Sequence, residues 1–238
     1  MLVEGHLHGS ILGNQHAIKN LIKALNERVG GDVWLIQGPK GIGKAKLITY
    51  LCSQMLELKN FDGVNIINPD FHLIKQEDAG KKFISVDKIR KVSQFFSTTS
   101  NNNGKIALID SISELNHYGH NSLLKILESL PIYSNVFLID HMSRLIPATI
   151  KSRCKSIHLK PLHTEDIYKI IEKKLAITDT ELLEFYSKLS NGSPGLAIKL
   201  FEYNSKELFN LLCKFIINNE DKNIAIIDKQ FNLLKDNQ

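Results

Sequence analysis

The sequence predicts an α/β fold, with a mainly parallel sheet covered by helices on both faces and a small helical domain behind it. Short apolar runs typical of buried strands alternate with longer segments whose apolar residues recur at helical spacing. A glycine-rich loop stands between one such strand and the helix that follows it. After residue 161 only helical patterns remain. Together these observations favour a nucleotide-binding type of domain followed by a helical one.

Four strands are predicted, all short and rich in branched or aromatic residues. They are "DVWLIQG" from Asp32, "KIALID" from Lys105, "NVFLID" from Asn135 and "KSIHL" from Lys155. Helical periodicity predicts helices over 14–31, 44–58, 85–98 and 114–131, with Ser85 as a cap and Pro131 as a stop.

The helical part begins after the loop around Pro161. Helices are predicted over 164–176, 178–189 and 193–203, each begun by Thr or Ser with an acidic residue or proline close behind. One or two amphipathic helices are expected in the rest. We therefore predict three regions: 1–161, an α/β domain of the nucleotide-binding type; 162–203, a helical lid; and 204–238, a short helical tail.

Composition narrows the class of protein. Hydrophobic residues make up 43% and charged residues 23% of the chain, and the net charge is +5, which permits contact with nucleic acid without arguing for it. The three cysteines lie far apart with no CxxC pair, which favours a reducing compartment and gives no zinc or disulfide framework. No secretory signal or membrane-length apolar run is recognisable, so we expect a soluble cytoplasmic protein without membrane contact.

The segment from Gly38 to Lys44 fits the phosphate-loop pattern G-x-x-x-x-G-K. Its glycines (Gly38, Gly41 and Gly43) let backbone N–H groups cradle phosphate oxygens, and Lys44 neutralises the outer phosphates. The sequence thus predicts an ATP or ADP site, working or vestigial. Ala45 stands where the full pattern has the Ser or Thr that coordinates magnesium.

Asp110 ends a predicted buried strand, where ligands gather in parallel sheets. A carboxylate there can hold a magnesium-bound water, although without the loop upstream a plain turn residue would be the better interpretation. Ser111 follows, where ATP-hydrolysing motors usually have a water-aligning Glu. Glu114 is expected to be a surface residue.

Two further sets of residues are candidates for a site. Arg153, in "IKSRC", is either a solvated surface charge or an arginine that reaches a neighbouring subunit's phosphates. The pairs His6 with His8 and His117 with His120 have metal-compatible spacing, but no carboxylate or cysteine cluster completes them, so we predict no metal site.

Seven segments of the chain form an ordered set: "ILGNQHAIKNL", "GPKGIGKAKL", "NPDFHLI", "ISVDKIRKVSQFFS", "KIALIDSISELNHYGHNSLLKILESLP", "RLIPATIKSRC" and "NGSPGLAIKL". The most specific markers among them are Ser152-Arg153-Cys154 and "NSLLKILES" from Asn121. In order and spacing the segments resemble bacterial clamp-loader subunits of the AAA+ class. From Ile11 to about Tyr203 the chain most resembles the delta-prime type of DNA polymerase III.

The resemblance implies an AAA+ module and a stator that turns over no ATP of its own while the loader places the sliding clamp on primed DNA. Arg153 would be the arginine finger offered to an adjacent motor subunit. Ala45, Ser111 and Gly195, which occupies the place of a lid arginine, depart from the motor pattern in agreement with this role. The family's cysteine-ligated zinc is not carried over, because its cysteines are missing, and the tail is shorter than a full collar domain.

The implied partners are motor subunits, a delta-type subunit, the sliding clamp indirectly, and DNA phosphates, for which Lys125 and Lys105 are candidate contacts. Two alternatives stay open: an ATP-hydrolysing motor subunit, and a degenerate paralogue that binds another replication partner. The resemblance implies a member of the DNA-directed DNA polymerase III holoenzyme, without ATPase activity of its own.

Overall fold

The computed structural model describes residues 12–27, 31–58, 61–75, 83–100 and 104–218. For residues 215–218 it describes the backbone alone. The chain divides into two compact units between Pro161 and Leu162. The first contains the sheet and the second contains helices α6 to α9.

Five parallel strands form the sheet, in the order β2-β3-β4-β1-β5. The strands are β1 (Asp32–Gln37), β2 (Phe71–Ile74), β3 (Ile106–Asp110), β4 (Asn135–Asp140) and β5 (Lys155–His158). This confirms the predicted α/β fold with its parallel sheet. The four predicted strands are present, and β2 is an edge strand that the sequence reading missed.

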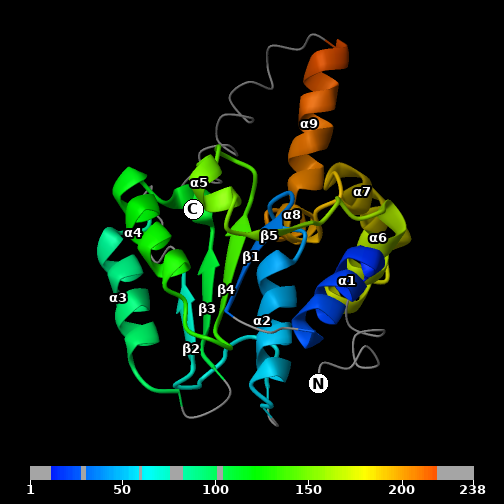
Figure 1. The fold of residues 1–238 in the computed structure, drawn as a ribbon. Helices are drawn as coiled ribbons and strands as arrows, with labels where there is room; N and C mark the ends of the chain where they lie inside the picture. The colour runs from blue at the N-terminus through cyan, green and yellow to red at the C-terminus, as the bar shows by residue number, and fades with distance from the viewer. Residues whose placement is uncertain (1–11, 28–30, 59–60, 76–82, 101–103, 219–238) are drawn as a thin grey trace. The chain divides into compact units, whose positions relative to one another are not determined.

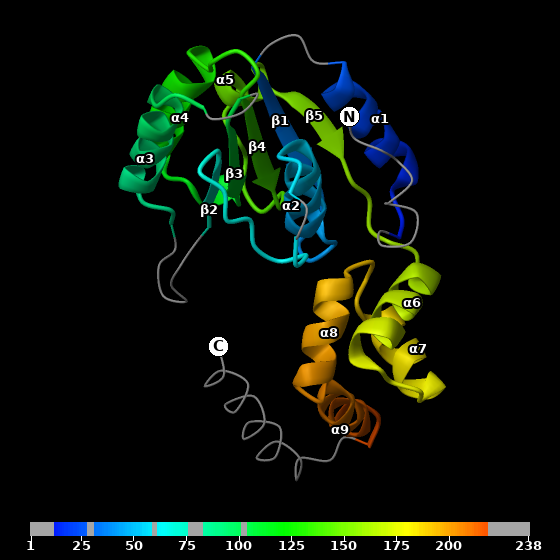
Figure 2. The same cartoon turned by 90° about the horizontal axis from the view of Figure 1, so that it is seen from below.

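Helices of the first unit cover both faces of the sheet, as Figures 1 and 2 show. Helices α3 and α4 lie side by side on one face, and α1 and α2 pack on the other. The bounds are α1 (Gln15–Asn26), α2 (Lys44–Met55), α3 (Val86–Ser97), the 3-10 turn η2 (Ile112–Glu114), α4 (His117–Glu128) and α5 (Ala148–Lys151).

The side chains of the central strands belong alternately to two hydrophobic clusters, because successive side chains of a strand point to opposite faces of the sheet. In β1, Trp34 and Ile36 join the cluster under α1 and α2, whereas Val33 and Leu35 join the one under α3 and α4. All six residues of β1 and of β4 are buried. Burial on both faces explains why these strands read as continuous apolar runs.

The second unit has its own core around Ile167, Ile171, Leu183 and Tyr186. Its helices are α6 (Thr164–Leu175), α7 (Thr180–Leu189), α8 (Pro194–Glu202) and α9 (Ser205–Asn218). The ring of Phe209, in α9, packs on Phe185 at 5.2 Å between centroids. The tail expected from 204 thus packs on α7 where it is described, and 219–238 lie outside the described residues.

Some predicted helix caps are shifted. Ser193 caps α8, its side chain accepting from the N–H of Leu196 at 3.1 Å. However, α7 is capped by Asp179, whose carboxylate accepts two backbone N–H bonds, and α6 follows His163. Ser85 stands at the N-cap of α3 without a side-chain bond to it.

Candidate functional site

The predicted phosphate loop leaves the carboxyl end of β1 and leads into α2. Strand β1 lies between β4 and β5, and the helices that follow β1 and β3 pack on opposite faces of the sheet. Ligands of open parallel sheets bind at such a reversal, outside the carboxyl ends of the strands. The loop therefore occupies the position where this fold binds ligands.

The loop glycines adopt backbone angles that side chains disfavour. Gly41 and Gly43 have φ of 82° and 95°, in the left-handed region. At Gly38 a Cβ would come within 2.4 Å of the carbonyl oxygen of Leu159. The first N–H groups of α2 have no partner within the helix, and such groups bind phosphate. The backbone of the loop thus fits a phosphate group.

Lys44 is only 2% exposed and folds back on its own loop. Its ammonium donates to the carbonyl oxygens of Gly38 and Pro39, each at 2.6 Å. Burial lowers the pKa of Lys44 to about 8, against the opposing effect of the Asp110 and Asp140 carboxylates, which raise it. The lysine is thus surrounded by carbonyl and carboxylate oxygens of the protein itself.

Asp110 lies where the sequence placed it, at the end of β3. Its Oδ1 is 3.5 Å from Nε2 of His141 and, among the described residues, makes no hydrogen bond although it is buried. A second carboxylate, Asp140, ends β4 and is itself buried. Its oxygens accept from the Gln37 amide at 2.9 Å and from the Met142 N–H at 2.7 Å.

The sequence reading missed Asp140 and His141. The signal was present, because "NVFLID" ends in aspartate like "KIALID", and parallel strands end at the same edge. With Ala45 in place of a hydroxyl, the donor set around the loop does not fit a magnesium ion bound in the usual way. Two carboxylates beside one lysine also oppose a nucleotide's negative charge.

Ser111 is buried with φ of 77°, and its hydroxyl lies 3.3 Å from that of Ser113. It carries no carboxylate that could align water. Glu114 is half-buried in η2 rather than exposed on a helix.

Arg153 lies near the amino ends of the strands, at the end of the sheet opposite the Gly38 loop. It stands in the turn before β5, and Lys155 pairs with Trp34 near the amino end of β1. From that level to Gly38 is four residues, about 13 Å along a strand. The guanidinium donates to Oε1 of Glu128 at 2.8 Å and to the carbonyl oxygen of Thr149 at 3.0 Å. Within the described unit, Arg153 is therefore remote from its own phosphate loop.

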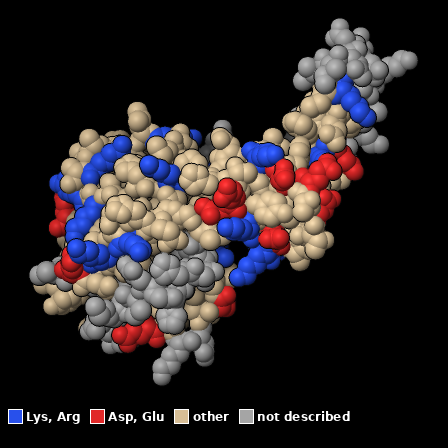
Figure 3. Space-filling model, turned by 90° about the vertical axis from the view of Figure 1, so that its right-hand side faces the viewer, with Lys and Arg blue, Asp and Glu red and all other residues tan. Residues whose placement is uncertain are grey.

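Of the lysines suggested for DNA contact, Lys105 does not qualify. It is 4% exposed and donates to the carbonyl oxygen of Phe95 and the hydroxyl of Thr98, at the end of α3. Lys125 is exposed on α4. On the face displayed in Figure 3, Lys and Arg are interspersed with Asp and Glu and form no continuous basic stripe.

No group of three or more His, Cys, Asp or Glu side chains that could hold a metal occurs in the described part of the chain. His117 bonds Asn121 at 3.3 Å, whereas His6 and His8 lie outside the described residues. Of the cysteines, Cys52 is buried, whereas Cys154 and Cys213 are half-buried. The helices searched include none long and apolar enough to span a membrane.

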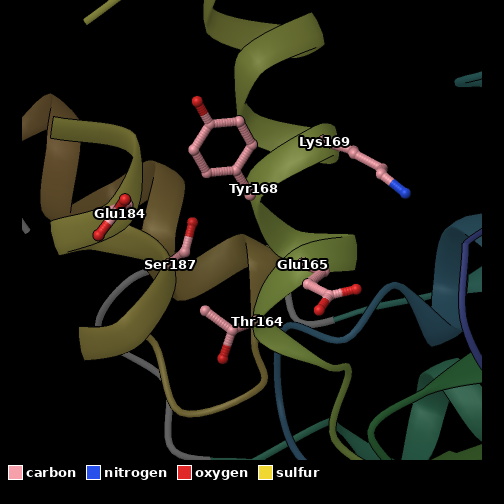
Figure 4. A pocket seen from close by; sticks show the side chains of 6 residues that line it. All are labelled: Thr164, Glu165, Tyr168, Lys169, Glu184 and Ser187. Atoms are coloured by element: carbon pink, nitrogen blue, oxygen red, sulfur yellow. The ribbon is translucent and has the colours of Figure 1, made fainter. Parts of the chain in front are cut away.

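The helical unit contains an open cleft of about 400 Å³ between α6 and α7. In Figure 4, the side chain of Lys169 extends away from those of Thr164, Glu184 and Ser187. The other lining residues are Glu165 and Tyr168.

Comparison with known proteins gives the family. A family model described as DNA polymerase III, delta subunit, matches residues 13–163, well over half of the chain. The chain belongs to this family. The resemblance to clamp-loader subunits of DNA polymerase III is thereby confirmed.

Relatives of the chain include delta', gamma and tau subunits of DNA polymerase III. The chain is 28% identical to the delta' subunit of Escherichia coli over 209 residues, covering 82% of this chain and 62% of the relative. It is 27% identical to the gamma subunit of Buchnera aphidicola from Schizaphis graminum over 206 residues, covering 81% and 57%. The chain thus spans about three fifths of the length of these relatives.

The fold is shared with solved AAA+ structures. A RuvB variant of Thermotoga maritima aligns with a TM-score of 0.57 at 20% identity, over 94% of this chain and 70% of that one. At this identity the likeness concerns the fold alone. The relatives thus include both delta' and gamma subunits of DNA polymerase III.

Proposed function

We propose that this chain is a delta-prime-like subunit of the DNA polymerase III clamp loader. In this role it is a stator that hydrolyses no ATP and supplies Arg153 to a neighbouring ATPase subunit while the sliding clamp is loaded. The observation that carries the proposal is the placement of Arg153 at the sheet edge opposite the Gly38 loop. An arginine there serves a phosphate site on another subunit, because it is remote from its own.

The chemistry of Arg153 suits this role. Its side chain is 39% exposed, so donors of its guanidinium are accessible to an incoming anion. The planar fork of an arginine binds phosphate oxygens in pairs and stabilises the charge that develops on a transferring phosphoryl group. Lysine offers only a point charge at such a position.

The Gly38 loop supports the non-hydrolysing half of the proposal. Efficient phosphoryl transfer needs magnesium, a positioned water and charge stabilisation. Ala45 lacks the magnesium-binding hydroxyl, Ser111 lacks a carboxylate, and Gly195 lacks a lid cation. A nucleotide held by the loop backbone and Lys44 would therefore remain uncleaved.

The proposed partners are motor subunits, a delta-type subunit, the clamp indirectly, and primed DNA. Contact with DNA would be to phosphates and independent of sequence. The exposed Lys125 remains a candidate contact, whereas the buried Lys105 does not. A cytoplasmic location follows from this role.

The test is ATP hydrolysis by a loader assembled from the full chain and its motor subunits. Arg153→Ala should slow hydrolysis at the site facing this chain by about a thousandfold or more. Lys44→Ala should leave hydrolysis unchanged. Arg90→Ala is the matched control, because Arg90 is also an exposed arginine paired with a carboxylate, that of Asp87 at 3.1 Å.

The alternative of an ATP-hydrolysing motor subunit has one observation in its favour, the backbone of the loop, which fits a phosphate. It predicts the reverse pattern, with Lys44→Ala abolishing hydrolysis. A degenerate paralogue would instead fail to assemble with the motor subunits and would co-purify with another partner.

A further inference from the structure

The guanidinium of Arg153 is held at two points in the free chain. One terminal nitrogen donates to the carboxylate of Glu128 at 2.8 Å, and the other donates to the carbonyl oxygen of Thr149 at 3.0 Å. Each terminal nitrogen carries a second N–H, and neither second N–H is needed for these bonds. The side chain is therefore fixed on one side while the remaining donors stay available.

Both groups that hold Arg153 stand on well-anchored elements. Glu128 is the last residue of α4, whose Leu123, Ile126 and Leu127 are buried in the core. Thr149 belongs to α5, where the next residue, Ile150, is fully buried. The two contacts thus fix the guanidinium relative to the sheet across two separate helices.

Stability does not account for this ion pair. The side chain of Glu128 is 54% exposed and that of Arg153 is 39% exposed, and pairs as open as this contribute little to folding. Fixing a long side chain in advance does, however, lower the entropy that it loses when it binds a target. The ion pair between Arg153 and Glu128 is therefore better explained by a binding role of Arg153 than by the stability of the chain.

We propose that Glu128 is a positioning residue for Arg153, holding the guanidinium in the orientation in which it meets a neighbouring subunit's phosphate. The inference rests on the proposed function, because it concerns how the arginine acts there. Glu128 itself touches no substrate. In the contrary role, Glu128 would compete with the phosphate for Arg153. Removing Glu128 would lower the rate of ATP hydrolysis in the first role and raise it in the second.

The experiment compares Glu128→Ala with Glu128→Gln in the assembled loader. Glutamine keeps an oxygen that accepts from Arg153, whereas alanine removes it. We expect Glu128→Ala to lower kcat for ATP by about threefold to tenfold with KM unchanged, because a mobile finger acts after ATP binds. Glu128→Gln should retain at least half of the kcat that Glu128→Ala loses.

Two controls separate positioning from a structural effect. In an Arg153→Ala background, Glu128→Ala should change nothing further, since a residue that acts through Arg153 has no second route. Asp87→Ala, which breaks the comparable exposed pair with Arg90, should leave kcat unchanged.

The results that overturn the inference differ from those that overturn the proposed function. If Arg153→Ala slows hydrolysis while Glu128→Ala leaves it unchanged or raises it, positioning is wrong and the stator role stands. Equal losses with alanine and glutamine would also overturn positioning by the hydrogen bond. If Arg153→Ala has no effect, the proposed function fails, and the positioning role fails with it.

Discussion

At the residue scale, Lys44 combines a buried ammonium with partners from its own protein. Two loop carbonyl oxygens accept its hydrogen bonds, and the Asp110 and Asp140 carboxylates favour its charged form. Burial outweighs the carboxylates, because the pKa still falls from 10.5 to about 8. The lysine of a phosphate loop has thus become a charge that the fold itself must stabilise.

This shift predicts how stability depends on pH. Below about pH 8 Lys44 is charged in the folded and the unfolded chain, so the cost of burying the charge is fully present. Between about pH 8 and 10.5 the unfolded chain binds more protons than the folded chain, so the free energy of unfolding rises with pH. The free energy of unfolding should rise by about 2 kcal/mol between about pH 7.5 and 9.5 through Lys44.

The measurement compares urea unfolding of the natural chain with that of Lys44→Met at both pH values. Trp34, the single tryptophan, is buried in β1 and reports on the sheet unit by fluorescence. The other titrating groups are common to both chains, so the difference isolates Lys44. A difference that does not grow in favour of the natural chain with rising pH would contradict the lowered pKa.

At the element scale, α4 runs from the carboxyl ends of the strands back to their amino ends. It begins after η2, beside the end of β3, and ends at Glu128, the partner of Arg153. Its start is fixed by Asn116, whose side-chain oxygen accepts the N–H of Gly119 at 2.8 Å. The cap bond therefore stabilises the first turn of the helix that carries Glu128 at its other end.

Replacing Asn116 by alanine should lower the free energy of unfolding by about 1 kcal/mol, because one orphan N–H of the helix loses its partner. Ser85→Ala is the matched control, since Ser85 stands at the N-cap of α3 without a side-chain bond to the helix. Its loss should be clearly smaller in the same urea titration. Equal losses would show that the cap bond of Asn116 contributes nothing particular.

Burial explains why the central strands could be predicted, although β5, which is largely exposed, was also predicted. Strands β1, β3 and β4 are buried on both faces and read as apolar runs, so periodicity found them. Edge strand β2 pairs only with β3, and only Ile74 of its four residues is buried, which leaves a weak hydrophobic pattern. Lys105 was misjudged because composition marks lysine as exposed, whereas here it donates to the end of α3.

The site was predictable where a local pattern encodes it. The glycines and Lys44 follow from one short motif, and Arg153 from a resemblance. The contact of Asp110 with His141 and the pairing of Arg153 with Glu128, 25 residues away, depend on the strand order and helix packing. No spacing in the sequence states those distances.

At the scale of the whole molecule, two units have separate hydrophobic clusters. Among the described residues, the sheet unit contains two large clusters, whereas the helical unit has one cluster with six buried side chains, the largest of them Tyr186. A small core loses a greater share of its stability when one large side chain is removed. The helical unit should therefore be the more sensitive of the two.

Tyr186→Ala tests this in the full chain. The ring is 1% exposed and packs edge-on against Phe185 and Phe201, so its removal should cost the helical unit about 3 to 5 kcal/mol. Hydrogen exchange should show lost protection across α6 to α8 and unchanged protection in β1, β3 and β4. Tyr118→Ala, at a position 72% exposed, should change neither unit. Loss of protection in the sheet as well would mean that the two units unfold together in one cooperative transition, despite the division of their contacts after Pro161.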